Sequence, residues 1–108
     1  MTSKTEKESK MNYKLIHNPK ENQYEYHIEG YLARLVYENR EGTLHLTHTF
    51  VPDELAGRGI AGALVKDVFA DIEHKGLKMM PACSYIVKYV EKYPEYECLL
   101  ADTIDNTK

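Results

Sequence analysis

A glycine-punctuated turn between a strand pattern and a helix pattern constrains this chain more than any other feature. The turn lies between Phe50 and Gly62 and carries two more glycines, Gly57 and Gly59. These glycines leave backbone N–H groups unshielded at the start of a helix, where unpaired donors and the helix dipole favour an anion. The sequence therefore predicts a strand-to-helix cradle for a phosphate group, built mostly from backbone.

Four short strands are expected before this turn. Apolar and polar residues alternate over four runs, at positions 12–17, 24–28, 32–37 and 43–51. Turn-forming residues separate these runs, at positions 18–22, 29–30 and 39–42. The pattern predicts an antiparallel meander of four strands.

A helix and a returning strand are expected after the turn. Apolar residues recur at helical spacing from Ile60 to Ile72, and His74 to Gly76 supplies a cationic last turn with a terminal glycine. Residues 77–80 form a short apolar strand. A right-handed crossover would place this strand parallel to the strand at 43–51.

A second helix completes the predicted fold. Ser84 is a candidate cap for a helix that runs to about Tyr93, where Pro94 stops it. Four tyrosines at helical spacing are expected to pack this helix on the sheet: Tyr85, Tyr89, Tyr93 and Tyr96. The predicted class is α/β, in the order β-β-β-β-α-β-α. Its sheet is mainly antiparallel, with strands four and five parallel.

The 108 residues suit one globular domain, which we expect over residues 12–101 between a disordered leader, 1–11, and a flexible tail, 102–108. The formal charge of −3 disfavours a nucleic-acid partner, and no apolar run approaches the roughly 18 residues of a membrane span. We expect a cytoplasmic protein that is a monomer or weak dimer.

The two cysteines do not indicate a metal site. Cys83 and Cys98 form no CxxC pair, so no metal site is predicted, and Cys98 is expected to pack beside apolar neighbours.

This order of elements resembles the GNAT superfamily of acetyl-CoA-dependent N-acetyltransferases. The family signature Gln/Arg-x-x-Gly-x-Gly/Ala falls on residues 56–61 and departs from it only at Ala56. Three further motifs resemble the small, single-domain GNAT-like branch: His48-Thr49-x-Val51, Pro81-x-Cys83 and Tyr93-Pro94-Glu95-Tyr96. The resemblance covers roughly residues 12–100.

The resemblance implies an acetyl-CoA site along the turn. Backbone N–H groups between Gly57 and Gly62 would hold the pyrophosphate, and Phe50 and Val51 would pair with the pantetheine arm like an added strand. Ala56 cannot supply the family's side-chain contact, which Arg58 would replace as a cation. The alternative is a turn that only packs strand against helix. The implied coenzyme-binding residues are Phe50, Val51, Gly57, Arg58, Gly59, Ile60, Ala61, Gly62 and Tyr89.

Cys83 is the sharpest candidate for catalysis because it lies between a strand and a helix, near the implied position of the thioester. A cysteine at a helix N-terminus can gain thiolate character and accept an acetyl group. Two alternatives stay open: Cys83 lines the thioester without reacting, or it is a small packing residue.

His48 is the candidate general base, since GNAT enzymes often place a base on this strand. The alternative is a structural histidine. His45 is three residues away, so regular alternation would place the two on opposite faces and make them a poor metal pair. Thr47 stands where the branch commonly has an acid, and Val90 stands where the family has a general-acid tyrosine, which leaves Tyr89 as a fallback.

The implied function is acetyl transfer from acetyl-CoA to an unknown amine. Larger GNAT enzymes place helices between their first two strands, whereas here only residues 18–22 connect them. The acceptor side is therefore open, which suits an amine on a protein or peptide. Two alternatives remain: a noncatalytic acyl-CoA-binding or sensing module, and a structural interaction domain.

Overall fold

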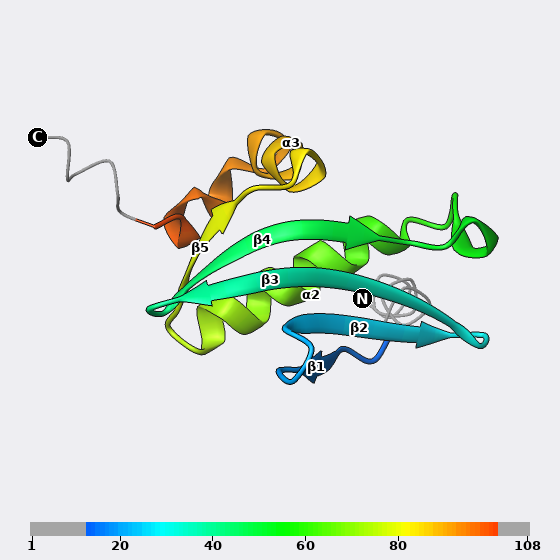
Figure 1. The fold of residues 1–108 in the computed structure, drawn as a ribbon. Helices are drawn as coiled ribbons and strands as arrows, with labels where there is room; N and C mark the ends of the chain where they lie inside the picture. Colours follow the sequence, from blue (N-terminus) through cyan, green and yellow to red (C-terminus); the bar gives the residue numbers. More distant parts are fainter. Residues whose placement is uncertain (1–12, 102–108) are drawn as a thin grey trace, which may run out of the picture.

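The computed structural model describes residues 13–101, so the expectations for residues 1–11 and 102–108 lie outside it. Its elements are, in chain order, β1 (Ile16–Asn18), β2 (Gln23–Ile28), β3 (Tyr31–Arg40), β4 (Thr43–Phe50), η1 (Asp53–Leu55), α2 (Ile60–His74), β5 (Lys78–Pro81), α3 (Ser84–Lys92) and η2 (Pro94–Leu99). The five strands form one sheet in sequence order, antiparallel except for the parallel pair β4–β5 (Figure 1). The predicted fold class is confirmed.

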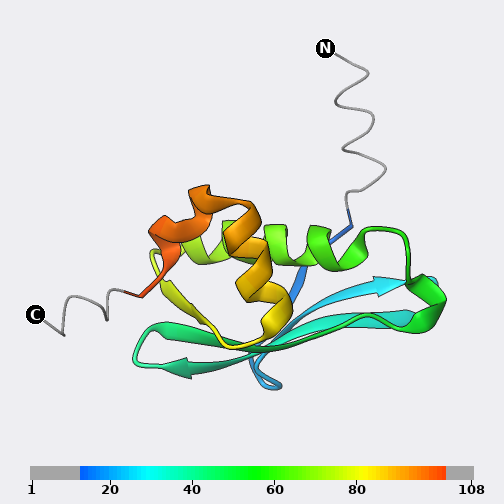
Figure 2. The same cartoon turned by 90° about the horizontal axis from the view of Figure 1, so that it is seen from above.

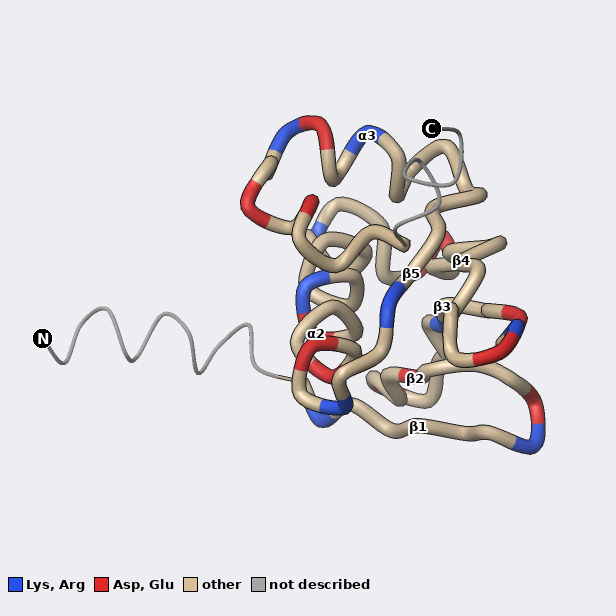
Figure 3. Tube along the Cα trace, turned by 90° about the vertical axis from the view of Figure 1, so that its left-hand side faces the viewer, with Lys and Arg blue, Asp and Glu red and all other residues tan. Residues whose placement is uncertain are grey.

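Both helices lie on one face of the sheet, which we call the helix face (Figure 2). The opposite face, the open face, carries no helix from residues 13–101. In the end-on view of Figure 3, charged positions gather at the turns between strands and along the outside of the helices. The core lies between sheet and helices, and its largest fully buried side chains include Tyr24, Tyr26, Leu35, Leu46, Leu64, Phe69 and Ile86.

The alternation of β2 decides which residues reach the core. Tyr24 and Tyr26 point to α2, where their hydroxyls donate to the carboxylates of Asp71 and Asp67. Intervening residues point to the open face. Glu25 is among them.

Several boundaries differ from those predicted. The first strand begins at Ile16 and has three residues, so the run near position 12 was placed too early. The third strand extends three residues past Tyr37, to Arg40, because its second half pairs with β4 as far as Arg40, beyond the end of its pairing with β2 at Val36. At the second helix, Cys83 and not Ser84 is the N-cap. The two 3-10 helices were not predicted, because residues 53–55 and 94–99 lack an extended hydrophobic period.

A β-bulge in β4 overturns the expectation for the two histidines. Val36 pairs with His48 and Tyr37 pairs with Leu46, so Thr47 is the extra residue. Its hydroxyl donates a 3.2 Å hydrogen bond to the carbonyl of Val36, which fixes the bulge.

The bulge reverses the alternation between the histidines. His45 pairs with Glu38 and His48 pairs with Val36. Glu38 and Val36 are two residues apart on β3, so they and the histidines paired with them share a face. His45 and His48 therefore both lie on the open face, and the prediction of opposite faces was wrong.

Candidate coenzyme site

The glycine turn is held in a conformation that only glycine adopts easily. Gly57 has φ of 83°, and Gly59, the N-cap of α2, has φ of 73° and ψ of 17°. Both lie in the left-handed region that disfavours other residues. A Cβ atom at Gly57 would meet nothing within 4 Å, so the backbone there is bare rather than crowded.

The N-terminus of α2 presents unpaired donors. Its first helical hydrogen bond runs from the N–H of Ala63 to the carbonyl of Gly59, at 3.1 Å, so the N–H groups before Ala63 have no helical acceptor. No side chain caps this end, and its first turn contains no acidic residue. The end of the helix therefore keeps its full attraction for an anion.

A pocket of about 260 Å³ lies at this helix end. Its lining residues come from the residue just after β4, the end of η1, the glycine turn, the first turn of α2 and the first turn of α3. They are Val51, Leu55, Ala56, Gly57, Gly59, Ile60, Ala61, Gly62 and Tyr85. Six of the nine implied coenzyme residues thus lie together, and Phe50, Arg58 and Tyr89 do not line this pocket.

Next to the pocket, β4 parts from β5. The two strands pair only as far as Leu46 and Pro81, and the last bond between them runs from the N–H of Ala82 to the carbonyl of Leu46, at 2.9 Å. β4 continues to Phe50 but pairs there only with β3 among the described residues. From Thr47 onward, the second edge of β4 is free to pair with an extended ligand.

Cys83 lies where the strands separate. It is partly buried at the N-cap of α3, and its thiol lies 3.8 Å from the hydroxyl of Thr49 in β4. Thr49 pairs with Leu35, which is in turn paired with Tyr24, so this contact is on the helix face. The thiol therefore points toward the free edge of β4 from the same side as the pocket.

His48 lies on the other side of β4. It is exposed on the open face, where its Nδ1 is 3.2 Å from the hydroxyl of Thr47. His48 and Cys83, the two candidate catalytic residues, are thus separated by the strand and do not act as a pair.

Two implied coenzyme residues have other partners. The guanidinium of Arg58 pairs with the carboxylate of Glu29 in the β2–β3 turn at 3.0 Å, and both groups are largely exposed. Phe50 is half exposed, and the guanidinium of Arg34 lies 5.6 Å from its ring centre. Phe50 therefore turns its side chain away from the helix face and leaves only its backbone for the free edge.

Two of the four tyrosines, Tyr89 of α3 and Tyr96 of η2, pack on α2, whereas the prediction placed the stripe on the sheet. Tyr89 and Tyr96 contact the ring of Phe69 in α2, with centroid distances of 5.7 and 4.8 Å. Burial, together with the neighbouring tyrosines, raises the pKa of Tyr89. Tyr85, at the start of the stripe, is the member that reaches the pocket, and sequence reasoning did not single it out.

The remaining cysteine also differs from expectation. Cys98 is exposed and its thiol donates to the carbonyl of Glu95 at 3.4 Å, while the adjacent Leu99 is buried. In this 3-10 helix Leu99 is buried and Cys98 is exposed, so Cys98 is not the packing residue that was predicted.

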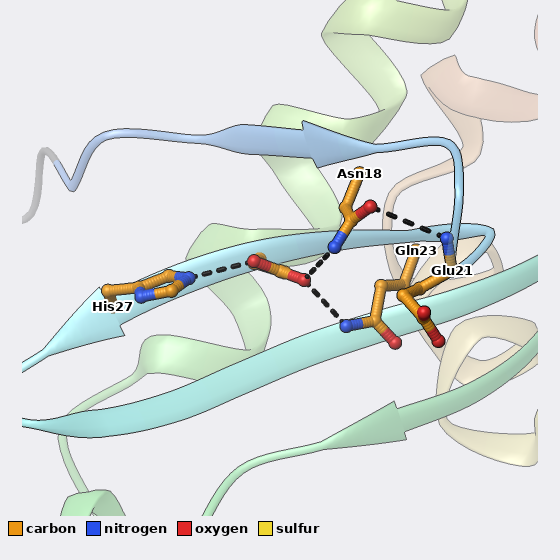
Figure 4. Close-up of polar contacts among 5 residues, drawn as sticks. Asn18, Glu21, Gln23 and His27 are labelled. Carbon is orange, nitrogen blue, oxygen red and sulfur yellow. Dashed lines mark hydrogen bonds and ion pairs between the residues drawn. The ribbon is translucent and has the colours of Figure 1, made fainter.

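The open face carries a separate polar cluster around Glu25 (Figure 4). One carboxylate oxygen accepts hydrogen bonds from Asn18 at 2.9 Å and from Gln23 at 2.6 Å, and the other lies 2.8 Å from Nε2 of His27. These bonds, from His27 first, then Gln23 and Asn18, lower the pKa of Glu25 to about 2. Because the carboxylate of Glu25 is hydrogen-bonded by side chains of β1 and β2, we interpret the cluster as a structural feature of the sheet.

Two kinds of feature are absent from residues 13–101. No group of three or more His, Cys, Asp or Glu side chains there is arranged to hold a metal ion. No helix in the same range has the length and apolar character needed to cross a membrane.

Comparison with known proteins points in one direction. The sequence-family model of the GCN5-related N-acetyltransferases matches residues 23–99. Protein NATD1 of Xenopus tropicalis is 38% identical over 81 residues, covering 72% of this chain and 74% of that protein. Protein NATD1 of Homo sapiens is 36% identical over 81 residues, covering 72% of each chain. The solution structure of a GCN5-like protein from Staphylococcus aureus superposes with a TM-score of 0.65 at 26% identity, covering 83% of this chain and 89% of that one.

Proposed function

Because this chain belongs to the GCN5-related N-acetyltransferase family, we propose that it binds acetyl-CoA and transfers the acetyl group to an amine. One observation carries the proposal. The pocket at the N-terminus of α2 brings unpaired backbone donors and the bare backbone of Gly57 to a single space. The donors suit a doubly charged pyrophosphate, so the residues present fit the coenzyme.

Each part of the coenzyme has a matching part of the chain. The first turn of α2, Ile60 to Gly62, would hold the pyrophosphate through its N–H groups. The free edge of β4, from Thr47 to Val51, would pair with the amide-containing pantetheine arm as an added strand. The acetyl group would then lie toward Thr49 and Cys83, beyond the last β4–β5 hydrogen bond.

The two faces of the sheet, on either side of the gap between β4 and β5, suit different substrates: the helix face suits the coenzyme and the open face suits the acceptor. The pocket lies on the helix face, whereas His48 lies on the open face, and only residues 19–22 connect β1 and β2. Residues 13–101 therefore build no enclosure over the open face. We propose that the acceptor amine approaches from there and that it belongs to a protein or peptide, which needs no enclosed pocket.

Two routes for acetyl transfer are compatible with these positions. In a direct route the amine attacks the acetyl carbon, and His48, or a water bound to it, removes the amine proton. In a two-step route the thiolate of Cys83 attacks first, the carbon–sulfur bond to the coenzyme breaks, and the departing thiolate takes up a proton. The amine then attacks the acetyl thioester on Cys83, loses its proton and frees the thiol.

Coenzyme binding is tested with matched glycine variants. Gly57→Glu places a carboxylate in the pocket, and Gly42→Glu makes the same change at another left-handed glycine, φ 90°, in the β3–β4 turn. Both variants carry similar backbone strain, so a shared effect reports on folding. We expect titration calorimetry with coenzyme A to show binding by the parent and by Gly42→Glu and none by Gly57→Glu. A parent that does not bind coenzyme A contradicts the proposal.

The two routes are separated by intact mass. After incubation with acetyl-CoA, the two-step route predicts one added acetyl group that is absent in Cys83→Ala and retained in Cys98→Ala, the matched control with an exposed thiol. A parent that turns over an amine without such an adduct, and a Cys83→Ala variant that keeps this activity, support the direct route. A noncatalytic coenzyme-binding module, the second candidate, would bind coenzyme A but acetylate no amine in a screen of peptides.

A further inference from the structure

The pocket has one wall that the glycine turn does not supply. Every lining residue but one lies between Val51 and Gly62, and the exception is Tyr85 in the first turn of α3. Tyr85 is 41% exposed, so part of its side chain is accessible to a ligand. The second helix therefore contributes a polar side chain to a site that is otherwise mainly backbone and small side chains.

The hydroxyl of Tyr85 lies beside the first turn of α2. A Cβ atom built at Gly62 would lie 3.6 Å from this oxygen, so the hydroxyl sits directly over the first turn of the helix. The glycine at this position keeps that space clear. Because this turn and Tyr85 line the same pocket, we expect an anion held by the N–H groups of the turn to lie within reach of the phenol.

The phenol is suited to donate. Burial, and to a smaller extent Tyr93, raise the pKa of Tyr85, so its proton stays on at neutral pH. A phenol carries no positive charge, so it adds a directed hydrogen bond without attracting anions in general. Ala56, at the position where the family has a longer polar side chain, provides no such bond.

We propose that Tyr85 is the side-chain ligand of the coenzyme pyrophosphate and supplies from α3 the contact that Ala56 cannot make. This inference rests on the proposed function. Tyr85 is two residues after Cys83, the N-cap of α3. The start of this helix therefore carries both the proposed ligand of the anion and the thiol near the acyl group. Tyr85 is a positioning residue, because it acts on the bound coenzyme and not on the reacting carbon.

The test measures coenzyme A binding by calorimetry in the parent and three variants. Tyr85→Phe removes the hydroxyl alone, Tyr85→Leu removes the ring as well, and Tyr93→Phe removes a hydroxyl from an exposed tyrosine outside the pocket. We expect Tyr85→Phe to weaken binding about tenfold, as for one hydrogen bond to a charged group, with Tyr93→Phe unchanged. Melting temperatures confirm that each variant is folded.

The two Tyr85 variants decide what the residue does. Equal losses in Tyr85→Phe and Tyr85→Leu assign the effect to the hydroxyl, as proposed. Parental affinity in Tyr85→Phe, whatever Tyr85→Leu does, overturns the inference, because the ring would then act only by packing. A parent that fails to bind coenzyme A rejects the proposed function itself, and that result is known before the variants are compared.

Discussion

Tyr24 in β2 and Asp71 in α2 are joined by a 2.6 Å hydrogen bond in which the phenol donates to the carboxylate. Two residues along the strand, Tyr26 makes the same kind of bond to Asp67, one helical turn earlier, and its one hydroxyl proton is shared with the carbonyl of Ala63, 3.0 Å away. The two-residue period of the strand therefore matches the turn of the helix. These bonds fix α2 along the sheet and, with it, the position of the helix end that lines the pocket.

The Tyr26 bonds predict a stability change. Tyr26→Phe removes a fully buried donor and leaves Asp67 and the Ala63 carbonyl with fewer partners, so we expect the free energy of unfolding to fall by about 1–3 kcal/mol in urea denaturation. Tyr31→Phe, at an exposed tyrosine of β3, is the control and should change it by less than about 0.5 kcal/mol. Equal effects at both positions would show that the hydroxyl bonds of Tyr26 do not support α2.

His17 predicts a loss of stability in mild acid. Its ring stacks on Tyr24, its Nε2 is 2.6 Å from the hydroxyl of Tyr37, and its Nδ1 is 3.2 Å from the ammonium of Lys75. Burial and the charge of Lys75 lower the pKa of His17 below 6.5, with Asp71 opposing them. The unfolded chain then binds the proton more readily than the folded chain, so the free energy of unfolding should fall as the pH drops through about 6.5.

Matched histidine variants check this pH dependence. His17→Gln should flatten the fall in unfolding free energy between about pH 7.5 and 5.5, measured by urea denaturation, whereas His74→Gln, at an exposed histidine of α2, should retain it. An unchanged slope in His17→Gln would assign the effect to another group.

The low pKa of Glu25 predicts a second loss of folding stability, at lower pH. Its folded pKa of about 2 lies below the ordinary 4.5, so its ionised form stabilises the fold above pH 4.5. That contribution should disappear as the pH falls from about 4.5 toward 2. Between about pH 4.5 and 2, urea denaturation should show a smaller fall in the free energy of unfolding for Glu25→Gln than for the parent. Glu38→Gln, at an exposed carboxylate paired with Arg40, should follow the parent, and a parental slope in Glu25→Gln would rule out the cluster as the cause.

The sequence predicted the parts of the fold that depend on local pattern. The period from Ile60 to Ile72 gave α2 its bounds, and the glycine turn placed most of the pocket. The bulge at Thr47 was not predictable, because it depends on a bond from Thr47 to Val36 across two strands. Tyr85 was missed for a similar reason. Spacing shows that tyrosines share a helix face, but only the packing of α3 on α2 shows which of them reaches the pocket.

Two glycines of the pocket predict opposite stability changes. Gly62 does not have a positive φ, and an added Cβ would make only ordinary contacts, at 3.6 Å to Tyr85 and 3.9 Å to Tyr89. Gly62→Ala should therefore raise the free energy of unfolding by about 0.5–1 kcal/mol through better helix propensity. Gly57 has φ of 83°, so Gly57→Ala should lower it by about 1–2 kcal/mol through backbone strain.

Urea denaturation of the two alanine variants at pH 7.5 measures this difference in sign. A fall in both would mean that the methyl group at Gly62 displaces the Tyr85 side chain, since no left-handed backbone is present there to be strained. A rise for Gly62→Ala, combined with weaker coenzyme A binding by the same variant, would show that the chain gives up helix stability at this position to keep the space between α2 and Tyr85 clear for a ligand.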